Sequence, residues 1–169
     1  MGKLKRVWSI VSSILVGVVV LAAALLAAAR LTGVQLYTIL SGSMEPTYHV
    51  GSLICVKKVA PEEVQVGDPI TFVLDDTLVV ATHRVIEIEQ DDDGAFRYRT
   101  KGDANPTPDG EEGVHQNNLL GKPFLTIPYL GYAANYVQHP PGMYVAIAAA
   151  VVILLLGFLP GGGKKRKES

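Results

Sequence analysis

The chain has 169 residues, of which 49% are hydrophobic and 18% are charged, and its formal net charge is −1. The length is sufficient for about one ordinary domain, and the hydrophobic content excludes an intrinsically disordered chain. A disulfide scaffold is also excluded, because Cys55 is the only cysteine; we expect it in the core. The charged fraction lies below the roughly 25% of soluble domains, which indicates that part of the chain lies in lipid.

The net charge is the sum of three regions of different sign. Residues 1–30 carry four basic and no acidic side chains, and residues 31–139 carry seven basic and fifteen acidic ones. Residues 140–169 carry four basic side chains and one acidic one. Both ends are therefore basic, and the middle is acidic.

The first basic end precedes an uncharged apolar run over residues 7–29. About 20 apolar residues in a helix cross the hydrocarbon core of a bilayer, so this run predicts a transmembrane helix. A secretory signal peptide is the alternative, since the run begins after basic residues and the alanines at 27–29 could serve as a cleavage site. The run is longer than the apolar core of a signal peptide, which favours the membrane helix.

The second apolar run, residues 141–160, precedes the basic residues 164–167. A buried core helix is the alternative to a second membrane span, but the abrupt basic flank favours the span. Because basic flanks stay on the cytoplasmic side, both termini are expected in the cytoplasm. We predict a cytoplasmic N-terminus (1–6), a transmembrane helix (7–29), an extracytoplasmic domain (30–140), a second transmembrane helix (141–160) and a cytoplasmic tail (161–169).

The segment between the spans has the pattern of a mainly β domain. Residues 52–59 and 70–74 are rich in β-branched and aromatic residues, whereas 78–89 and 95–100 alternate apolar with polar positions. Four residues at 91–94 (DDDG) predict a hairpin turn, and they lack the ligand spacing of a calcium loop. Residues 121–132, with their glycines and prolines, predict a loop.

A candidate nucleophile lies in residues 41–46 (SGSMEP). Two serines and a glycine favour a tight turn that Pro46 stiffens. A serine on such a turn exposes its hydroxyl, and neighbouring amides could stabilise an oxyanion. An ordinary linker turn is the alternative.

A serine nucleophile needs a base, and histidine titrates near neutral pH. His83 differs from His49, His115 and His139 because it lies in a strand-like pattern rather than in a polar or proline-rich loop. A structural histidine in a strand is the alternative. None of the four has the ligand spacing of a zinc site, so we expect no metal.

A base also needs a group that orients it, and two aspartates follow the predicted strand at 95–100. Asp103 and Asp109 flank residues 104–108, and each could instead be a turn or cap residue. The order serine, histidine, aspartate gives a candidate triad in which the acid is open between these two.

Together these segments resemble the type I signal peptidases of peptidase family S26, in particular the archaeal and endoplasmic-reticulum type. Residues 41–46 resemble the nucleophile box, and 83–85 (HRV) resemble the base box, where the bacterial branch has a lysine. Residues 101–109 (KGDANPTPD) resemble the acidic box. Two further segments, 67–72 and 121–131, also match family boxes. The departures are Ser52 for a common aspartate, Ala104 for a common asparagine, and the stiff residues 106–108.

The resemblance implies a serine endopeptidase, with a mainly β catalytic domain on the outer membrane face, that cleaves secretory precursors after a small-x-small motif. It implies Ser43 as nucleophile and His83 as base, with Asp109 as the triad acid and Asp103 as an accompanying acid. The oxyanion would be held by the Ser43 amide and the Ser41 hydroxyl. Met44 is expected to contact the substrate.

The resemblance also implies that no cofactor is needed. The expected partners are signal-peptide-bearing precursors, the lipid bilayer and the protein translocation channel; no nucleic acid is expected. Two alternatives remain: a non-catalytic, membrane-anchored β module of a secretion assembly, and a peptidase dedicated to a few substrates.

Overall fold

The structure of the chain is a computed structural model, which describes residues 2–74 and 79–158. The chain divides into two compact units: residues 30–135 form a β-rich unit, and residues 1–29 group with residues from 136 onward. Each unit is described by itself below.

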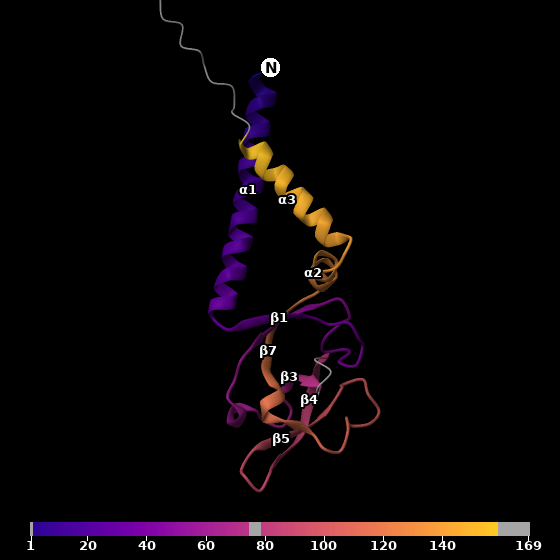
Figure 1. The fold of residues 1–169 in the computed structure, drawn as a ribbon. Helices are drawn as coiled ribbons and strands as arrows, with labels where there is room; N and C mark the ends of the chain where they lie inside the picture. Colours follow the sequence, from indigo (N-terminus) through magenta and orange to yellow (C-terminus); the bar gives the residue numbers. More distant parts are fainter. Residues whose placement is uncertain (1, 75–78, 159–169) are drawn as a thin grey trace, which may run out of the picture. The chain divides into compact units, whose positions relative to one another are not determined.

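The β-rich unit is built on a seven-stranded sheet with the order β1-β2-β7-β3-β4-β5-β6 (Figure 1). Every neighbouring pair of strands in the sheet is antiparallel. The mainly β architecture expected from the sequence is therefore confirmed. The strands are β1 (Val34–Thr38), β2 (Leu53–Lys57), β3 (Pro69–Leu74), β4 (Val79–Gln90), β5 (Phe96–Lys101), β6 (Val114–His115) and β7 (Leu119–Ile127). Two single turns of 3₁₀ helix, η1 (Pro61–Glu63) and η3 (Gln116–Asn118), connect them.

The turn between β4 and β5 is the hairpin predicted at residues 91–94. The amide of Asp91 donates to the carbonyl of Ala95 at 2.8 Å, and the amide of Gly94 donates to the carbonyl of Asp91 at 2.8 Å. Gly94 has a φ of 81°, a left-handed conformation that glycine adopts without steric cost. The hairpin prediction is therefore confirmed.

The prediction of a loop over residues 121–132 is wrong. Strand β7 occupies much of this stretch and lies inside the sheet, where it pairs with both β2 and β3. Pro123 cannot donate a ladder hydrogen bond, but it lies opposite Val56, at a register shift that interrupts the ladder. The bulge thus accommodates a proline whose presence in the sequence suggested a loop.

Two clusters of buried side chains form the core of the β-rich unit. The first packs between β3, β4 and β5, and its buried members are Val64, Ile70, Phe72, Val85 and Tyr98. The second lies beneath the segment that follows β1, and its buried members are Met44, Tyr48, Ile54 and Val56.

Cys55 is buried in β2, as the sequence predicted. Burial raises the pKa of its thiol, which disfavours the reactive thiolate. Cys55 is thus a packing residue.

Three helices complete the described chain: α1 (Gly2–Leu31), α2 (Leu130–Gln138) and α3 (Gly142–Phe158). Within α1, the segment Arg6–Leu31 is long and apolar enough to cross a membrane by length and composition. Helices α2 and α3 meet that criterion only as a pair, and the pair is bent by 91°. The described residues therefore contain one helix of spanning length, or two if the bent pair counts as one. The end of the expected second span and the expected tail at 161–169 lie outside the described residues.

Candidate active site

The serine-rich segment, residues 41–49, forms a turn between β1 and β2. Its base is closed by two backbone hydrogen bonds, Ile39 N–H to Ser52 O at 2.9 Å and Gly51 N–H to Ile39 O at 2.8 Å. Within the turn, the amide of Tyr48 donates to the carbonyl of Met44 at 2.9 Å. We call residues 41–49 the nucleophile turn.

Met44 and Tyr48 anchor the nucleophile turn to the core. Met44 is 1% exposed and packs in the second core cluster together with Tyr48. Burial of a large apolar side chain stabilises a fold by about 1.5–3 kcal/mol, so Met44 holds the turn in place from beneath. Met44 also lines the cleft described below, but its buried side chain leaves little surface for the substrate contact expected from the sequence.

Ser43, His83 and Asp109 form one chain of hydrogen bonds. The Oγ atom of Ser43 lies 3.1 Å from Nε2 of His83, and Nδ1 of His83 lies 2.6 Å from Oδ2 of Asp109. The hydroxyl of Thr100 donates to the same Oδ2 atom at 2.7 Å. The structure therefore brings together three residues that lie far apart in the sequence.

The strands fix the orientation of the histidine and the aspartate. His83 lies in β4 opposite Ile70 of β3, and its ring meets the edge of Phe72 with 6.2 Å between ring centroids. The amide of Asp109 donates to the carbonyl of Thr100 at 2.9 Å, which ties the loop after β5 to that strand. His83 and Asp109 are partly shielded from water, with 15% and 28% of their side chains exposed.

Asp103 is close to the site but bonds to Arg84 rather than to His83. The Nε and Nη2 atoms of Arg84 donate to its two carboxylate oxygens at 2.8 and 2.7 Å, and Thr47 Oγ1 donates to Oδ2 at 2.5 Å. The Arg84 hydrogen bonds, more than that of Thr47, hold the pKa of Asp103 below its ordinary value in spite of partial burial. Asp103 therefore links the nucleophile turn to β4.

The acidic loop, residues 102–109, touches the nucleophile turn directly. The amide of Ala104 donates to the carbonyl of Ser43 at 2.9 Å. A Cβ atom on Gly102 would lie 2.6 Å from the same carbonyl, closer than side chains come to backbone atoms. Only glycine fits at this position without moving Ser43.

Two residues of this network, Thr47 and Thr100, were not singled out in the sequence, and two more, Arg84 and Gly102, lie in the base and acidic boxes but were given no role of their own. Arg84 directly follows His83, and adjacent residues in a strand point to opposite faces. The sequence therefore gave no reason to expect both side chains to face the same site.

His49 and His115 form hydrogen bonds outside this chain. His49 pairs with Glu45 at the surface of the nucleophile turn. His115 Nδ1 accepts a hydrogen bond from the amide of Asn117 at 3.2 Å, and His139 follows α2. Among residues 2–74 and 79–158, no three histidine, cysteine or acidic side chains are grouped as metal ligands.

A cleft of about 460 Å³ opens beside the serine. Ser43 and His83 form part of its wall. Most of the remaining lining is apolar and comes from two segments, the end of β1 with the residues after it and the start of β4. The lining residues are Tyr37, Thr38, Ile39, Leu40, Ser41, Ser43, Met44, Leu74, Val79, Val80, Ala81, Thr82, His83 and Asn105.

A serine hydroxyl, an imidazole and a carboxylate in one hydrogen-bonded chain, beside an apolar cleft, have the arrangement of a serine hydrolase. The sequence profile described as "Signal peptidase, peptidase S26" matches residues 11–94. The chain belongs to this signal peptidase family, whose members are serine-protease hydrolases. The matched region includes Ser43 and His83 and ends before the acidic loop.

Individual relatives carry the same family name. The signal peptidase complex catalytic subunit SEC11C of Rattus norvegicus is 27% identical over 129 residues, which cover 72% of this chain and 67% of that protein. The human SEC11C is similar to the same extent. Signal peptidase I W of Bacillus subtilis (strain 168) is 45% identical over 78 residues, or 46% of this chain and 40% of that protein.

Proposed function

We propose that this protein removes signal peptides from secretory precursors, with Ser43 as nucleophile, His83 as general base and Asp109 as the group that orients His83. The observation that carries this proposal is the hydrogen-bonded chain from Ser43 through His83 to Asp109.

The reaction proceeds through an acyl-enzyme. Ser43 Oγ attacks the scissile carbonyl while its proton passes to Nε2 of His83. His83 then protonates the leaving amine, the C–N bond breaks, and the signal peptide stays bound to Ser43 as an ester. Water, deprotonated by His83, attacks the ester and releases the peptide with a carboxylate end, which restores the Ser43 hydroxyl.

The negative charge on the carbonyl oxygen needs nearby donors. Within the described part of the chain, no group accepts a hydrogen bond from the Ser43 amide. The Ser41 hydroxyl lies 3.2 Å from Ser43 Oγ. We assign this amide and this hydroxyl to the oxyanion, since donors aimed at a developing charge supply a large part of the rate enhancement in acyl transfer.

Asp109 is the better choice for the triad acid because it accepts from His83 Nδ1 at 2.6 Å. A carboxylate there stabilises the imidazolium that forms when His83 takes the proton. Asp103 is neutralised by Arg84 at 2.7 and 2.8 Å, so we assign it the task of holding the nucleophile turn against β4.

The cleft fits an extended, largely apolar substrate segment. Its two walls, residues 37–40 and 79–82, would flank a peptide that bonds through its main chain, which aligns many different sequences. Narrow side-chain pockets then select small residues by excluding larger ones. This is the basis for the proposed small-x-small preference.

The proposed topology places this chemistry on the outer membrane face. Helix α1 and the apolar segment at 141–160 are proposed as spans, with both basic ends in the cytoplasm. Such spans would hold the β-rich unit at the bilayer, where a signal helix ends and where the translocation channel delivers precursors.

The test is cleavage of a model precursor by the purified full chain and by His83→Gln, Asp109→Asn and Asp103→Asn variants. His83→Gln and Asp109→Asn should lower kcat by at least about 10²-fold without lowering the melting temperature. Asp103→Asn should lower the melting temperature. Full cleavage by His83→Gln would reject the mechanism and favour a non-catalytic β module.

The small-x-small preference is tested on the substrate. A precursor whose two small residues are replaced by phenylalanine should resist cleavage, whereas phenylalanine at the middle position should be tolerated. Equal cleavage of all three precursors would reject this preference and leave the peptidase assignment intact.

A further inference from the structure

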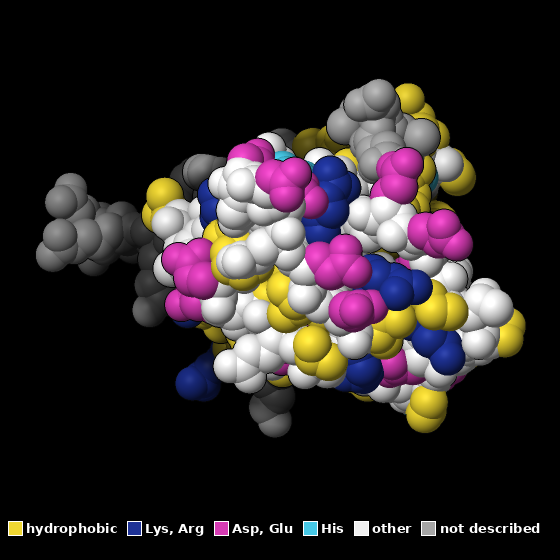
Figure 2. All heavy atoms as spheres, turned by 90° about the horizontal axis from the view of Figure 1, so that it is seen from below, with side chains coloured by type: hydrophobic (Ala, Val, Ile, Leu, Met, Phe, Trp, Pro, Cys, Tyr) yellow, Lys and Arg dark blue, Asp and Glu magenta, His cyan; other side chains and the backbone are white. Residues whose placement is uncertain are grey.

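An uncharged, tyrosine-rich stretch of sequence begins within β7 and includes α2 and α3. No Asp, Glu, Lys or Arg occurs from residue 123 to residue 163, and this segment holds four of the seven tyrosines. Each of the four, Tyr129, Tyr132, Tyr136 and Tyr144, is more than half exposed. A helix that faces water normally has a charged side, and acidic and basic side chains are interspersed on the face of the β-rich unit in Figure 2. Helix α2 has none.

Helix α2 has one side that packs on the β-rich unit. Gly131 is buried, and a Cβ atom there would lie 2.5 Å from the carbonyl oxygen of Ser52. The Thr38 hydroxyl donates to the carbonyl of Gly131 at 3.5 Å. The ring of Tyr132 covers Gly51, where a Cβ atom would lie 1.9 Å from the ring. The first turn of α2 is therefore docked on the segment that closes the base of the nucleophile turn.

The two aromatic side chains of α2 nevertheless keep more than half of their surface exposed. Tyr132 and Tyr136 are four residues apart and share a helix face. Tyr129 precedes them with a φ of 63° and is 78% exposed. A left-handed backbone costs a tyrosine about 1–2 kcal/mol, and here it accompanies an aromatic ring that is largely exposed. Such an unfavourable placement in water suggests a function.

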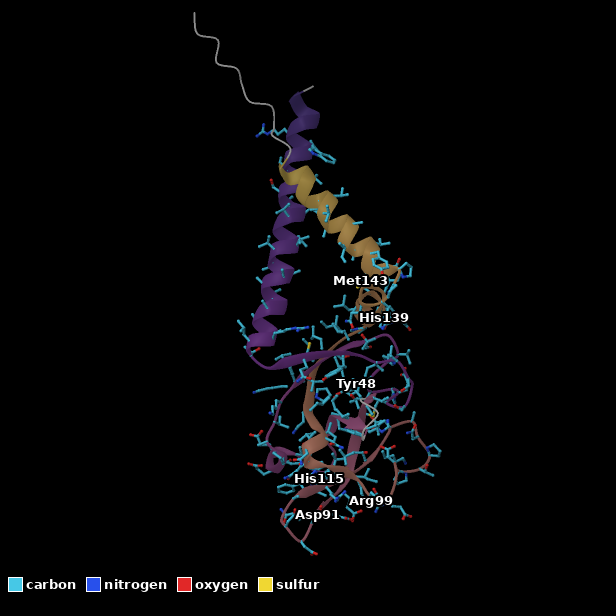
Figure 3. The ribbon with its side chains drawn as sticks, in the orientation of Figure 1. Tyr48, Asp91, Arg99, His115, His139 and Met143 are labelled. Atoms are coloured by element: carbon cyan, nitrogen blue, oxygen red, sulfur yellow. The ribbon has the colours of Figure 1, made fainter. Side chains whose placement is uncertain are left out.

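The junction between α2 and α3 turns the chain through 91°. His139 and Met143 flank this bend (Figure 3), and the Met143 amide donates to the His139 carbonyl at 3.1 Å. A Cβ atom on Gly142 would lie 2.0 Å from the Tyr136 carbonyl oxygen, so the tight bend requires glycine. Since α3 is apolar on all sides, as a membrane helix is, and membrane helices tilt by about 20°, this bend would lay α2 nearly parallel to the bilayer plane.

We propose that α2 is an interfacial helix, whose residues Tyr129, Tyr132 and Tyr136 lie between the lipid headgroups and the acyl chains. Tyrosine favours this boundary because its ring is apolar and its hydroxyl is polar. The partner is a lipid surface of no particular charge, because α2 offers no basic side chain. The proposal rests on the membrane topology proposed above.

The consequence concerns the position of the nucleophile. Gly131 and Tyr132 pack on Gly51 and Ser52, and these two residues bond to Ile39 to close the nucleophile turn. A helix held at the interface therefore sets the height of Ser43 above the bilayer. That height determines which peptide bond after a signal helix reaches the serine.

Depth-dependent fluorescence quenching tests the proposal on the full chain in phosphatidylcholine vesicles. In a Trp8→Phe background, tryptophan is placed at Tyr136, at Val151 in α3 and at Asp92 in the hairpin turn. Each variant is measured in two kinds of vesicle, one whose lipids carry bromine near the glycerol and one whose lipids carry bromine near the ends of the acyl chains. For Tyr136→Trp, we expect stronger quenching by bromine near the glycerol. Absent quenching, or stronger quenching near the chain ends, would overturn the proposal.

The two controls separate this proposal from those on which it rests. Val151→Trp should be quenched by bromine near the chain ends and Asp92→Trp by neither lipid. If Val151→Trp were not quenched, the spanning α3 and the interfacial α2 would both be rejected. Cleavage of a precursor by the same variants reports on the peptidase mechanism separately.

Two further experiments complete the test: one changes the lipid composition, and the other substitutes the glycine at the bend. Replacing half of the phosphatidylcholine by phosphatidylglycerol should leave the quenching of Tyr136→Trp unchanged, and a strong increase would show that basic residues, not α2, make the contact. Gly142→Ala should open the bend, change the depth of the tryptophan and spread cleavage over neighbouring bonds of a precursor. An unchanged depth of the tryptophan and a single cleavage site in Gly142→Ala would contradict the proposal that α2 sets the height of Ser43 above the bilayer.

Discussion

Thr100 shows how a single hydroxyl contributes to the site. It is buried in β5 and donates to the Asp109 oxygen that also faces His83. This bond restrains the carboxylate that lies against His83, and a hydrogen bond to a charged group contributes about 1.5–3 kcal/mol. We therefore classify Thr100 as a positioning residue for Asp109.

Replacing Thr100 by valine should lower kcat by about tenfold and leave KM unchanged, because only the transition state forms the imidazolium that Asp109 stabilises. The measurement is steady-state cleavage of a precursor peptide. Thr71→Val is the matched control, since Thr71 is equally buried and its hydroxyl bonds to Thr82, outside the hydrogen-bonded chain of Ser43, His83 and Asp109. Equal losses of kcat in both variants would show that Thr100 acts through stability alone.

The ion pair of Asp103 with Arg84 makes the stability of the fold depend on pH. The Arg84 hydrogen bonds lower its pKa in the folded state, whereas an unfolded aspartate titrates near 3.9. A lowered folded pKa means that Asp103 stabilises the fold at pH values above about 3.9 and that this stabilisation is lost as the pH falls through the folded pKa.

The Asp103→Asn variant should therefore melt at a lower temperature than the parent chain at pH 7, and the difference should shrink below about pH 4. Thermal unfolding in detergent, followed by circular dichroism, measures the difference in melting temperature at each pH. Asp91→Asn is the control, because the ion pair of Asp91 with Arg97 at the hairpin turn is more exposed to water than that of Asp103 with Arg84. A difference for Asp103→Asn that stays constant from pH 7 to pH 3 would contradict the ion-pair explanation.

The sequence identified the residues that the structure brings together here, but not the residues that support them. Ser43, His83 and the two aspartates occur in a recognisable order of boxes. The sequence could not decide between Asp103 and Asp109, because that choice depends on which carboxylate the fold brings to His83 and which it gives to Arg84. Thr47 and Thr100 carry no sequence signal, since a threonine in a turn or a strand needs no functional explanation.

At the scale of elements, the acidic loop and the nucleophile turn act as one unit because their backbones touch. Gly102→Ala would place a methyl group 2.6 Å from the Ser43 carbonyl oxygen and should displace the nucleophile. We expect kcat to fall by at least about 10²-fold, since a displacement near 1 Å can have that effect. Gly110→Ala in the same region meets nothing within 4 Å and should retain activity. Retained activity in Gly102→Ala would show that the close approach is not required.

The predicted strands were those with a strong local pattern. Strands β2, β3, β4 and β5 have β-branched or alternating residues, so burial of one face follows from the sequence. Strand β7 was mistaken for a loop because Pro123 and Gly121 suggest a turn, whereas its place in the sheet depends on pairing with β2 and β3 far along the chain. Gly121 is required there because a Cβ atom would lie 2.1 Å from the Lys57 carbonyl oxygen.

At the scale of the whole molecule, the charge pattern has a topological meaning. Basic ends and an acidic middle are arranged around two apolar runs, which predicts that both ends stay in the cytoplasm. A tag after residue 169 should therefore resist protease added to the outer face of intact cells and become sensitive after lysis. Digestion of the tag in intact cells would reject the two-span topology.

The identity of the nucleophile is the central claim, and cleavage of a secretory precursor by the purified full chain tests it most directly. The Ser43→Ala variant should insert into membranes and fold as the parent chain does, yet its cleavage rate should fall by at least about 10³-fold. Cleavage by Ser43→Ala at a rate near that of the parent chain would contradict the mechanism.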